Sequence, residues 1–79
     1  MTDLKGTLAN IARAIVDSPE DVVVTVTEES ENTISLKLSV ATGDMGKVIG
    51  KHGKIAKAIR TIMKAAAIAD GKEVNVEIK

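Results

Sequence analysis

The stretch Asp44–Arg60, DMGKVIGKHGKIAKAIR, contains the pattern that decides how this chain folds and what it can bind. Gly50 and Gly53 bracket two basic residues, Lys51 and His52. Glycine can adopt a positive φ and lets another backbone come close. A loop that opens a helix also presents unpaired N–H groups at the positive end of the helix dipole, which suits a phosphate. The loop is therefore predicted to grip a nucleic-acid backbone rather than to read bases.

The charges of the chain are segregated although its formal net charge is zero. Residues 45–72 carry seven basic side chains against one acid, a net charge of +6. The rest of the chain carries four basic side chains against ten acids, a net charge of −6. This asymmetry predicts an anionic partner for the basic segment. A solvated helix face explains most lysine-rich stripes, but the position of this one beside the glycine loop favours a functional role.

Length and composition narrow the classes of protein that fit. The 79 residues predict one domain, residues 1–79, near the lower size limit for a self-sufficient core. The chain has no cysteine, so neither disulfides nor thiolate metal sites are expected. No apolar run approaches the roughly 18 residues of a membrane span, and the polar N-terminus lacks the apolar region of a signal peptide. These features predict a cytoplasmic protein with no membrane span.

The first half of the chain predicts a helix and a β-hairpin. Apolar residues at spacings of four, three and four predict a helix over residues 3–17 with Thr2 as its N-cap, and these residues are Leu4, Leu8, Ile11 and Ile15. The β-branched run 22–26 and the alternating run 34–40 predict two strands. The polar segment 28–32 between them predicts a turn, so the two strands should pair antiparallel.

The second half predicts two helices around the loop and a final strand. Asp44 is expected to cap a short helix over residues 45–49, and a long helix should cover residues 54–69 before the end signal at residues 70–71. The alternating run 74–78 predicts the last strand. A helical crossover joins the second and third strands, so they should be parallel if adjacent. The predicted fold is a two-layer α/β sandwich with a mixed three-stranded sheet.

The predicted long helix has two chemically distinct sides. At 100° per residue, the apolar side is predicted to face the core and contains Ile55, Ile59, Ile62, Met63 and Ala66. The opposite side forms a basic stripe that starts at the glycine loop, and its members are Lys54, Lys57, Arg60 and Lys64. Ile68 falls near the basic stripe and is a candidate contact for a partner.

The segment Val48–Gly53, placed between two predicted helices, resembles the signature of the KH domain family. In that family a GxxG loop clamps the backbone of about four nucleotides. The order of elements resembles the type II KH fold, α-β-β-α-α-β, and the resemblance covers the whole chain. Residues 45–51 and 55–60 resemble more narrowly the small stand-alone KH proteins of bacteria.

The resemblance implies single-stranded RNA as the ligand and assigns the RNA-binding residues, which are Lys47, Ile49, Gly50, Lys51, His52, Gly53, Lys54 and Lys57. One position departs from the family pattern. Many KH domains carry a bulky aliphatic residue three positions after the second glycine, where this chain has Ala56. Ile55 and Ile59 are expected to supply the missing packing.

The resemblance also implies a biological setting. Similar proteins act as RNA chaperones or post-transcriptional regulators, in cell elongation and envelope homeostasis. They form homodimers or heterodimers, the latter with a larger Jag/KhpB-type RNA-binding protein. These roles come from the resemblance alone, and it implies no cofactor.

Two enzymatic alternatives fit the residues poorly. A nucleotide-binding P-loop needs four residues between its glycines and a hydroxyl after the lysine. The segment Gly46–His52 has three intervening residues and no hydroxyl there. His52 is the only histidine, so a metal site is not expected. With no nucleophile signature in the chain, we do not expect an enzyme.

The absence of Phe, Tyr and Trp limits how RNA could be recognised. Many single-strand binders stack bases on aromatic rings, so this chain would have to rely on amides, charge and an aliphatic groove. A rival interpretation remains open, in which a KH fold serves as a protein-interaction adaptor and RNA contact is incidental. An adaptor would tolerate Lys51→Asp and His52→Asp, whereas an RNA binder would not.

Overall fold

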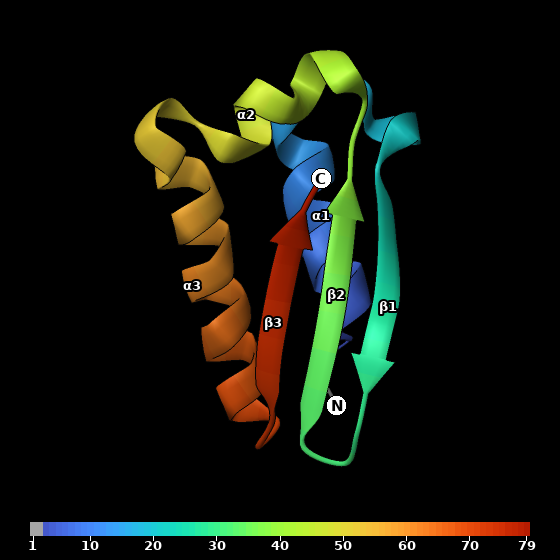
Figure 1. Ribbon diagram of the computed structural model, residues 1–79, viewed down its shortest axis with the longest axis vertical. Helices are drawn as coiled ribbons and strands as arrows, with labels where there is room; N and C mark the ends of the chain where they lie inside the picture. Colours follow the sequence, from blue (N-terminus) through green and yellow to red (C-terminus); the bar gives the residue numbers. More distant parts are fainter. Residues whose placement is uncertain (1–2) are drawn as a thin grey trace.

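The computed structural model describes residues 3–79, which include three short 3₁₀ helices, at Pro19–Asp21, Thr42–Asp44 and Lys51–Gly53. The main elements are three α-helices and three strands. In chain order they are α1 (Leu4–Ile15), β1 (Val23–Glu29), β2 (Thr33–Ser39), α2 (Met45–Ile49), α3 (Lys54–Ala69) and β3 (Glu73–Ile78). Figure 1 shows the helices gathered on one face of the sheet, with α3 beside β3 and α1 behind the strands. The predicted order α-β-β-α-α-β and the two-layer arrangement are confirmed.

The sheet has the strand order β1-β2-β3 and is mixed, as predicted. β1 pairs antiparallel with β2, with a bulge between Val26 and Glu28, and β2 pairs parallel with β3. β1 runs three residues further than expected because Glu28 and Glu29 continue the ladder with β2. Their charged side chains remain exposed, so polarity alone did not end the strand.

α1 begins and ends at residues that the sequence pattern did not identify. The Asp3 carboxylate caps the helix by accepting a 3.0 Å hydrogen bond from the Gly6 N–H. The predicted N-cap, Thr2, lies outside the described residues. The helix stops at Ile15 rather than at residue 17, because Val16 adopts an extended conformation with ψ of 161°. This early exit turns the chain toward α2.

The core lies between the inner face of the sheet and the helices. β2 alternates as predicted, so every second side chain points inward. The fully buried large side chains come from four different elements, and they are Leu8, Leu36, Leu38, Val48, Ile59 and Met63. Val48 is the buried residue of α2, so this short helix has one apolar anchor.

The predicted core side of α3 was partly wrong. Ile59 and Met63 are buried, but Ile55 and Ile62 are 37% and 50% exposed. The buried row is completed by two alanines, Ala56 and Ala67. The apolar arc of α3 is wider than the surface that α1 and β3 cover, so periodicity could not say which part of the arc faces inward. Small side chains at the contact let α3 approach its neighbours closely.

Candidate nucleic-acid interface

Three of the four residues in the loop between α2 and α3 have positive φ angles. Gly50 lies at φ 74° and ψ 174°, His52 at φ 58° and ψ 25°, and Gly53 at φ 74° and ψ 14°. The loop is closed by a 3.2 Å hydrogen bond from the Gly53 N–H to the Gly50 carbonyl. Within residues 3–79, His52 is the one non-glycine residue with positive φ. Such backbone strain persists only where the surrounding structure supports it, and it gathers at functional loops.

The two glycines of the loop are needed for different reasons. Gly50 occupies a region of φ/ψ space that is essentially restricted to glycine. A β-carbon there would also lie 2.5 Å from Cγ1 of Ile55. Gly53 is in the ordinary left-handed region, with no atom within 4 Å of where its β-carbon would be. Ile55 therefore packs against the loop, whereas Ile59 is buried in the core. The two isoleucines that were expected to compensate for Ala56 thus pack in different places.

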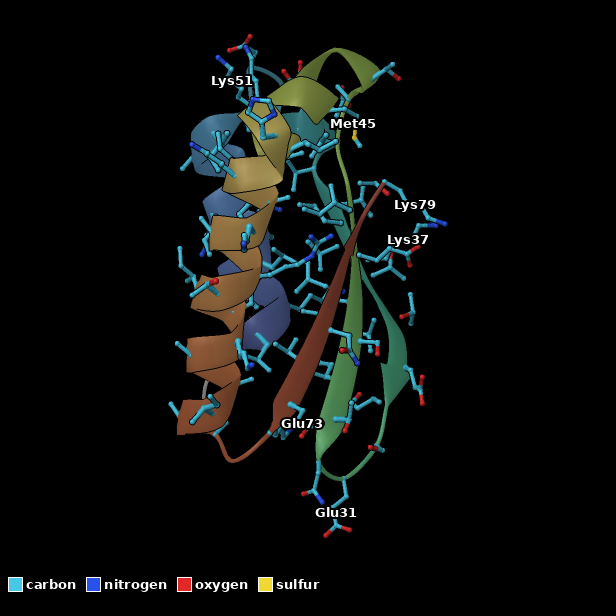
Figure 2. The ribbon with its side chains drawn as sticks, turned by 60° about the vertical axis from the view of Figure 1, so that its left-hand side comes forward. Glu31, Lys37, Met45, Lys51, Glu73 and Lys79 are labelled. Carbon is cyan, nitrogen blue, oxygen red and sulfur yellow. The ribbon has the colours of Figure 1, made fainter. Side chains whose placement is uncertain are left out.

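The start of α3 is suited to an anion. Gly53 is the N-cap residue and no side chain caps this end of the 16-residue helix. The helix dipole and its first amide groups together favour negative charge at this point. The neighbouring side chains of Lys51 and His52 are exposed. Figure 2 shows Lys51 at the end of the molecule, projecting away from the sheet.

The basic stripe runs from this loop along the exposed side of α3, as its spacing predicted. Lys54, Lys57, Arg60 and Lys64 are all exposed. The Arg60 Nε donates a 3.2 Å hydrogen bond to the Val76 carbonyl, so this guanidinium joins α3 to β3. The two ion pairs found within residues 3–79 involve none of these four residues. Their charge is therefore not offset by a paired carboxylate in that part of the chain.

Lys47 lies in a different environment from the other basic candidates. Its ammonium is 2.7 Å from a carboxylate oxygen of Asp17, in the segment that follows α1. The hydrogen bond and the negative charge of Asp17 raise the pKa of Lys47 above its ordinary value. A phosphate would have to compete with Asp17 for this ammonium. The neighbouring candidate Ile49 is 39% exposed at the end of α2.

Asp44 occupies the N-cap position of α2, as predicted. Its side chain makes no capping bond to α2. Its two oxygens instead accept hydrogen bonds from the backbone N–H groups of Asp17, at 3.3 Å, and Ser18, at 3.0 Å. These partners lie 27 and 26 residues earlier in the chain. No local sequence pattern could have revealed them.

A shallow pocket extends the surface beyond the basic stripe. It lies between the last turns of α3 and the start of β3, and its lining residues are Lys64, Ile68, Lys72, Glu73, Val74 and Asn75. Lys72 and Asn75 were not singled out from the sequence, because only the return of the chain into β3 brings them beside α3. Among the described residues, no group of three acidic or histidine side chains could hold a metal ion. No helix of residues 3–79 could cross a membrane.

A GxxG loop between two helices, beside a mixed three-stranded sheet in the order α-β-β-α-α-β, defines a KH domain of type II. The family model described as KhpA/KhpB, KH domain matches residues 5–78, and the chain belongs to this family. The narrower resemblance carried by residues 45–51 and 55–60 was to KhpA. That resemblance is confirmed.

Curated relatives agree with the family model over nearly the full length. The RNA-binding protein KhpA of Clostridium acetobutylicum is 53% identical over 75 residues, which cover 95% of this chain and 99% of that protein. The RNA-binding protein KhpA of Bacillus subtilis is 46% identical over 80 residues, covering 99% of this chain and 98% of that protein. The relatives are named as RNA-binding proteins.

Two solved structures of Era share the fold. Era of Aquifex aeolicus bound to GDP·AlF4− matches with a TM-score of 0.69 at 19% identity, covering 95% of this chain and 29% of Era. Era in complex with MgGDPNP and nucleotides 1506–1542 of 16S ribosomal RNA matches with a TM-score of 0.67, also at 19% identity, covering 95% of this chain and 28% of Era. The chain thus spans less than a third of the length of these proteins, and the likeness is one of fold.

Proposed function

We propose that this protein binds single-stranded RNA by gripping its sugar-phosphate backbone with residues 50–53. One observation carries the proposal: a loop with positive φ at Gly50, His52 and Gly53, which exposes the side chains of Lys51 and His52, leads into a helix end that no side chain caps. Its relatives are named RNA-binding proteins, which supports the same class of ligand.

Each candidate residue has a distinct role in this proposal. Gly50 and Gly53 let the RNA backbone approach the loop amides, and Lys51 and His52 supply side-chain contacts to phosphates. Lys54 and Lys57 continue the contact along α3, and Ile49 offers an apolar surface beside the loop. Lys47 joins only when a phosphate displaces Asp17 from its ammonium. Such an exchange is feasible because an exposed ion pair contributes little free energy.

The biological role that we propose follows the family. Residues 1–79 would form a single KH domain that acts in the cytoplasm as an RNA chaperone or post-transcriptional regulator. It would act in cell elongation and envelope homeostasis with a Jag/KhpB-type RNA-binding protein. Without aromatic residues for stacking, one domain should bind short RNA weakly, so avidity from a second RNA-binding unit would raise the affinity.

Charge reversal in the loop tests the proposal. Lys51→Asp combined with His52→Asp should weaken RNA binding at least tenfold in a gel-shift titration, while circular dichroism remains that of the folded protein. Lys5→Asp combined with Asn10→Asp is a matched control, because it changes the net charge equally at two exposed positions of α1. If the folded loop variant bound RNA as tightly as the control does, the adaptor interpretation would replace RNA binding.

For the assembly, we propose pairing with a second copy of this chain through α3. Exposed apolar side chains recur along this helix at spacings of three and four residues, and they are Ile55, Ala58, Ile62, Ala65 and Ala69. This is the heptad pattern of a coiled-coil seam: Ile55 and Ile62 take the first apolar position of two successive heptads and Ala58 and Ala65 the second, while Ala69 takes the first position of the next heptad. We call these five residues the α3 seam.

The alternation of large and small residues favours an antiparallel pair. In an antiparallel arrangement the first apolar position of one helix faces the second position of its partner. Each isoleucine of the α3 seam would then meet an alanine, which lets the two helices interdigitate. A parallel pair would instead place isoleucine against isoleucine. Ile68, which is 65% exposed, would lie at the edge of the contact rather than at its centre.

This pairing is testable because the contact is small. A seam of one 16-residue helix buries less than the roughly 1,200 Å² of a stable complex, so the dimer should be weak. Sedimentation analysis should show a concentration-dependent dimer that Ile62→Asp abolishes and Ile68→Asp weakens less. Val23→Asp, at a similarly exposed residue of β1, is the matched control. A wild-type monomer at high concentration would refute self-pairing. If a Jag/KhpB-type protein then bound the wild type but not Ile62→Asp, the seam would belong to that partner.

A further inference from the structure

Asp44 is the buried charged residue of the described chain, with 4% of its surface exposed. Burying a carboxylate costs free energy unless it is hydrogen-bonded. Asp44 meets this requirement with the N–H groups of Asp17 and Ser18, one at each oxygen. Because these donors lie just beyond the end of α1, the carboxylate ties α1's exit to the entrance of α2.

Lys47 makes the reciprocal contact one turn further along α2. Its ammonium binds the carboxylate of Asp17, the residue whose backbone N–H is bound by Asp44. Residue 17 is therefore held by α2 through both its backbone and its side chain. We call Asp17, Ser18, Asp44 and Lys47 the α2 clamp.

The α2 clamp fixes the position of α2, a helix too short to be stable by itself. α2 has five residues, far fewer than an isolated helix needs in water. Val48 is its one buried side chain, so a single apolar residue anchors α2 in the core. Gly50 follows α2 directly, and its N–H donates to the Gly46 carbonyl at 2.8 Å. A rotation of α2 would therefore be passed to the loop.

We infer that Asp44 is a positioning residue for RNA binding: it keeps α2 at the angle that aims the amides and basic side chains of residues 50–53 at a phosphate. The inference rests on the proposed function of this loop. A site held in its binding conformation loses less conformational entropy on binding than a mobile one. Loosening the α2 clamp at Asp44 should therefore weaken RNA binding without removing any group that touches RNA.

Asp44→Asn is the variant that tests this, because it keeps the size of the side chain but places an NH2 group against one of the two N–H donors. At a temperature where it is folded, its Kd for RNA should rise about tenfold. The slope of log affinity against log salt should stay unchanged, because the phosphate contacts are the same in number. Amide hydrogen exchange should become faster at residues 50–53.

A control variant separates positioning from general stability. Ile34→Val trims a buried side chain at the hairpin end of β2, which Figure 1 shows at the opposite end of the molecule from the loop. It should lower the melting temperature but leave the Kd for RNA and exchange at residues 50–53 unchanged. If Asp44→Asn does not fold, Asp44→Glu keeps the charge, displaces it by one methylene, and gives the same readouts.

The outcomes distinguish the inference from the proposed function. If Lys51→Asp with His52→Asp leaves RNA binding intact, the proposed function fails. If that variant loses RNA but a folded Asp44 variant binds as the wild type does, with unchanged exchange in the loop, the positioning role is overturned. A weakened Kd with exchange that rises evenly over the whole chain would also overturn it, because the effect would then be general destabilisation.

Discussion

The side chain of Ile55 lies against Gly50, so the first turn of α3 supports the loop that precedes it. A β-carbon at Gly50 would lie 2.5 Å from Cγ1 and 2.9 Å from Cβ of Ile55. Neither of these atoms is the far end of a flexible side chain, so the contact could be relieved only by moving α3 or the loop. The close approach at Gly50 is thus as important as its backbone angles.

This relationship predicts that the two loop glycines differ in tolerance although their φ angles are equal. Gly50→Ala should lower the free energy of unfolding by about 3 kcal/mol, since backbone strain of roughly 1–3 kcal/mol adds to the clash with Ile55. Gly53→Asn should cost less than about 1 kcal/mol, because asparagine tolerates the left-handed region and no neighbour is in the way. Urea unfolding followed by circular dichroism measures both. Equal losses would show that Ile55 does not constrain Gly50.

The basic stripe predicts a salt dependence for RNA binding. If residues 50–53 and the lysines of α3 neutralise about three phosphates, log affinity should fall with log salt at a slope of about −2. Lys57→Gln should make that slope shallower by about 0.7, because one phosphate contact is lost. Lys37→Gln is the control, since Figure 2 shows Lys37 on the face of the sheet that points away from the helices. A slope that Lys57→Gln leaves unchanged would place Lys57 outside the contact.

The start of α1 offers a test of the cap that the sequence pattern missed. Asp3→Ala removes the acceptor for the Gly6 N–H and should lower the free energy of unfolding by about 1 kcal/mol. Asp3→Asn keeps an acceptor oxygen and should cost much less. Thermal unfolding of the two variants gives the comparison. If both were as stable as the wild type, the cap would make no contribution in solution.

The sequence predicted correctly the features that depend on residues close together in the chain. The bounds of α3 were predicted correctly because its signals are local: a helix start after Gly53, a periodic run, and an end at residues 70–71, where Gly71 has φ of 70°. The parallel pairing of β2 with β3 followed from the helical crossover between them. At the candidate site, the exposure of Lys51 and His52 followed from the polarity of the loop.

The features that sequence reasoning missed depend on contacts between distant segments. Asp44 has the residue type and position of an N-cap, and only the arrival of Asp17 and Ser18 gives its carboxylate other donors. Lys47 looks like the other lysines until Asp17 is placed beside it. Ile55 and Ile62 share the apolar arc of α3 with the buried residues, and only the positions of α1 and β3 decide which part of the arc is covered.

Two adjacent residues of α3 give the sharpest test of which part of its apolar arc faces the core. Met63 is fully buried, so Met63→Ala should lower the free energy of unfolding by about 3 kcal/mol, a large share of the total stability of so small a domain. Ile62 is 50% exposed, so Ile62→Ala should change it by less than about 0.5 kcal/mol in the monomer. Denaturant titrations at low micromolar concentration keep any weak dimer dissociated. A loss for Ile62→Ala close to that for Met63→Ala would mean that α3 turns a different side toward the core.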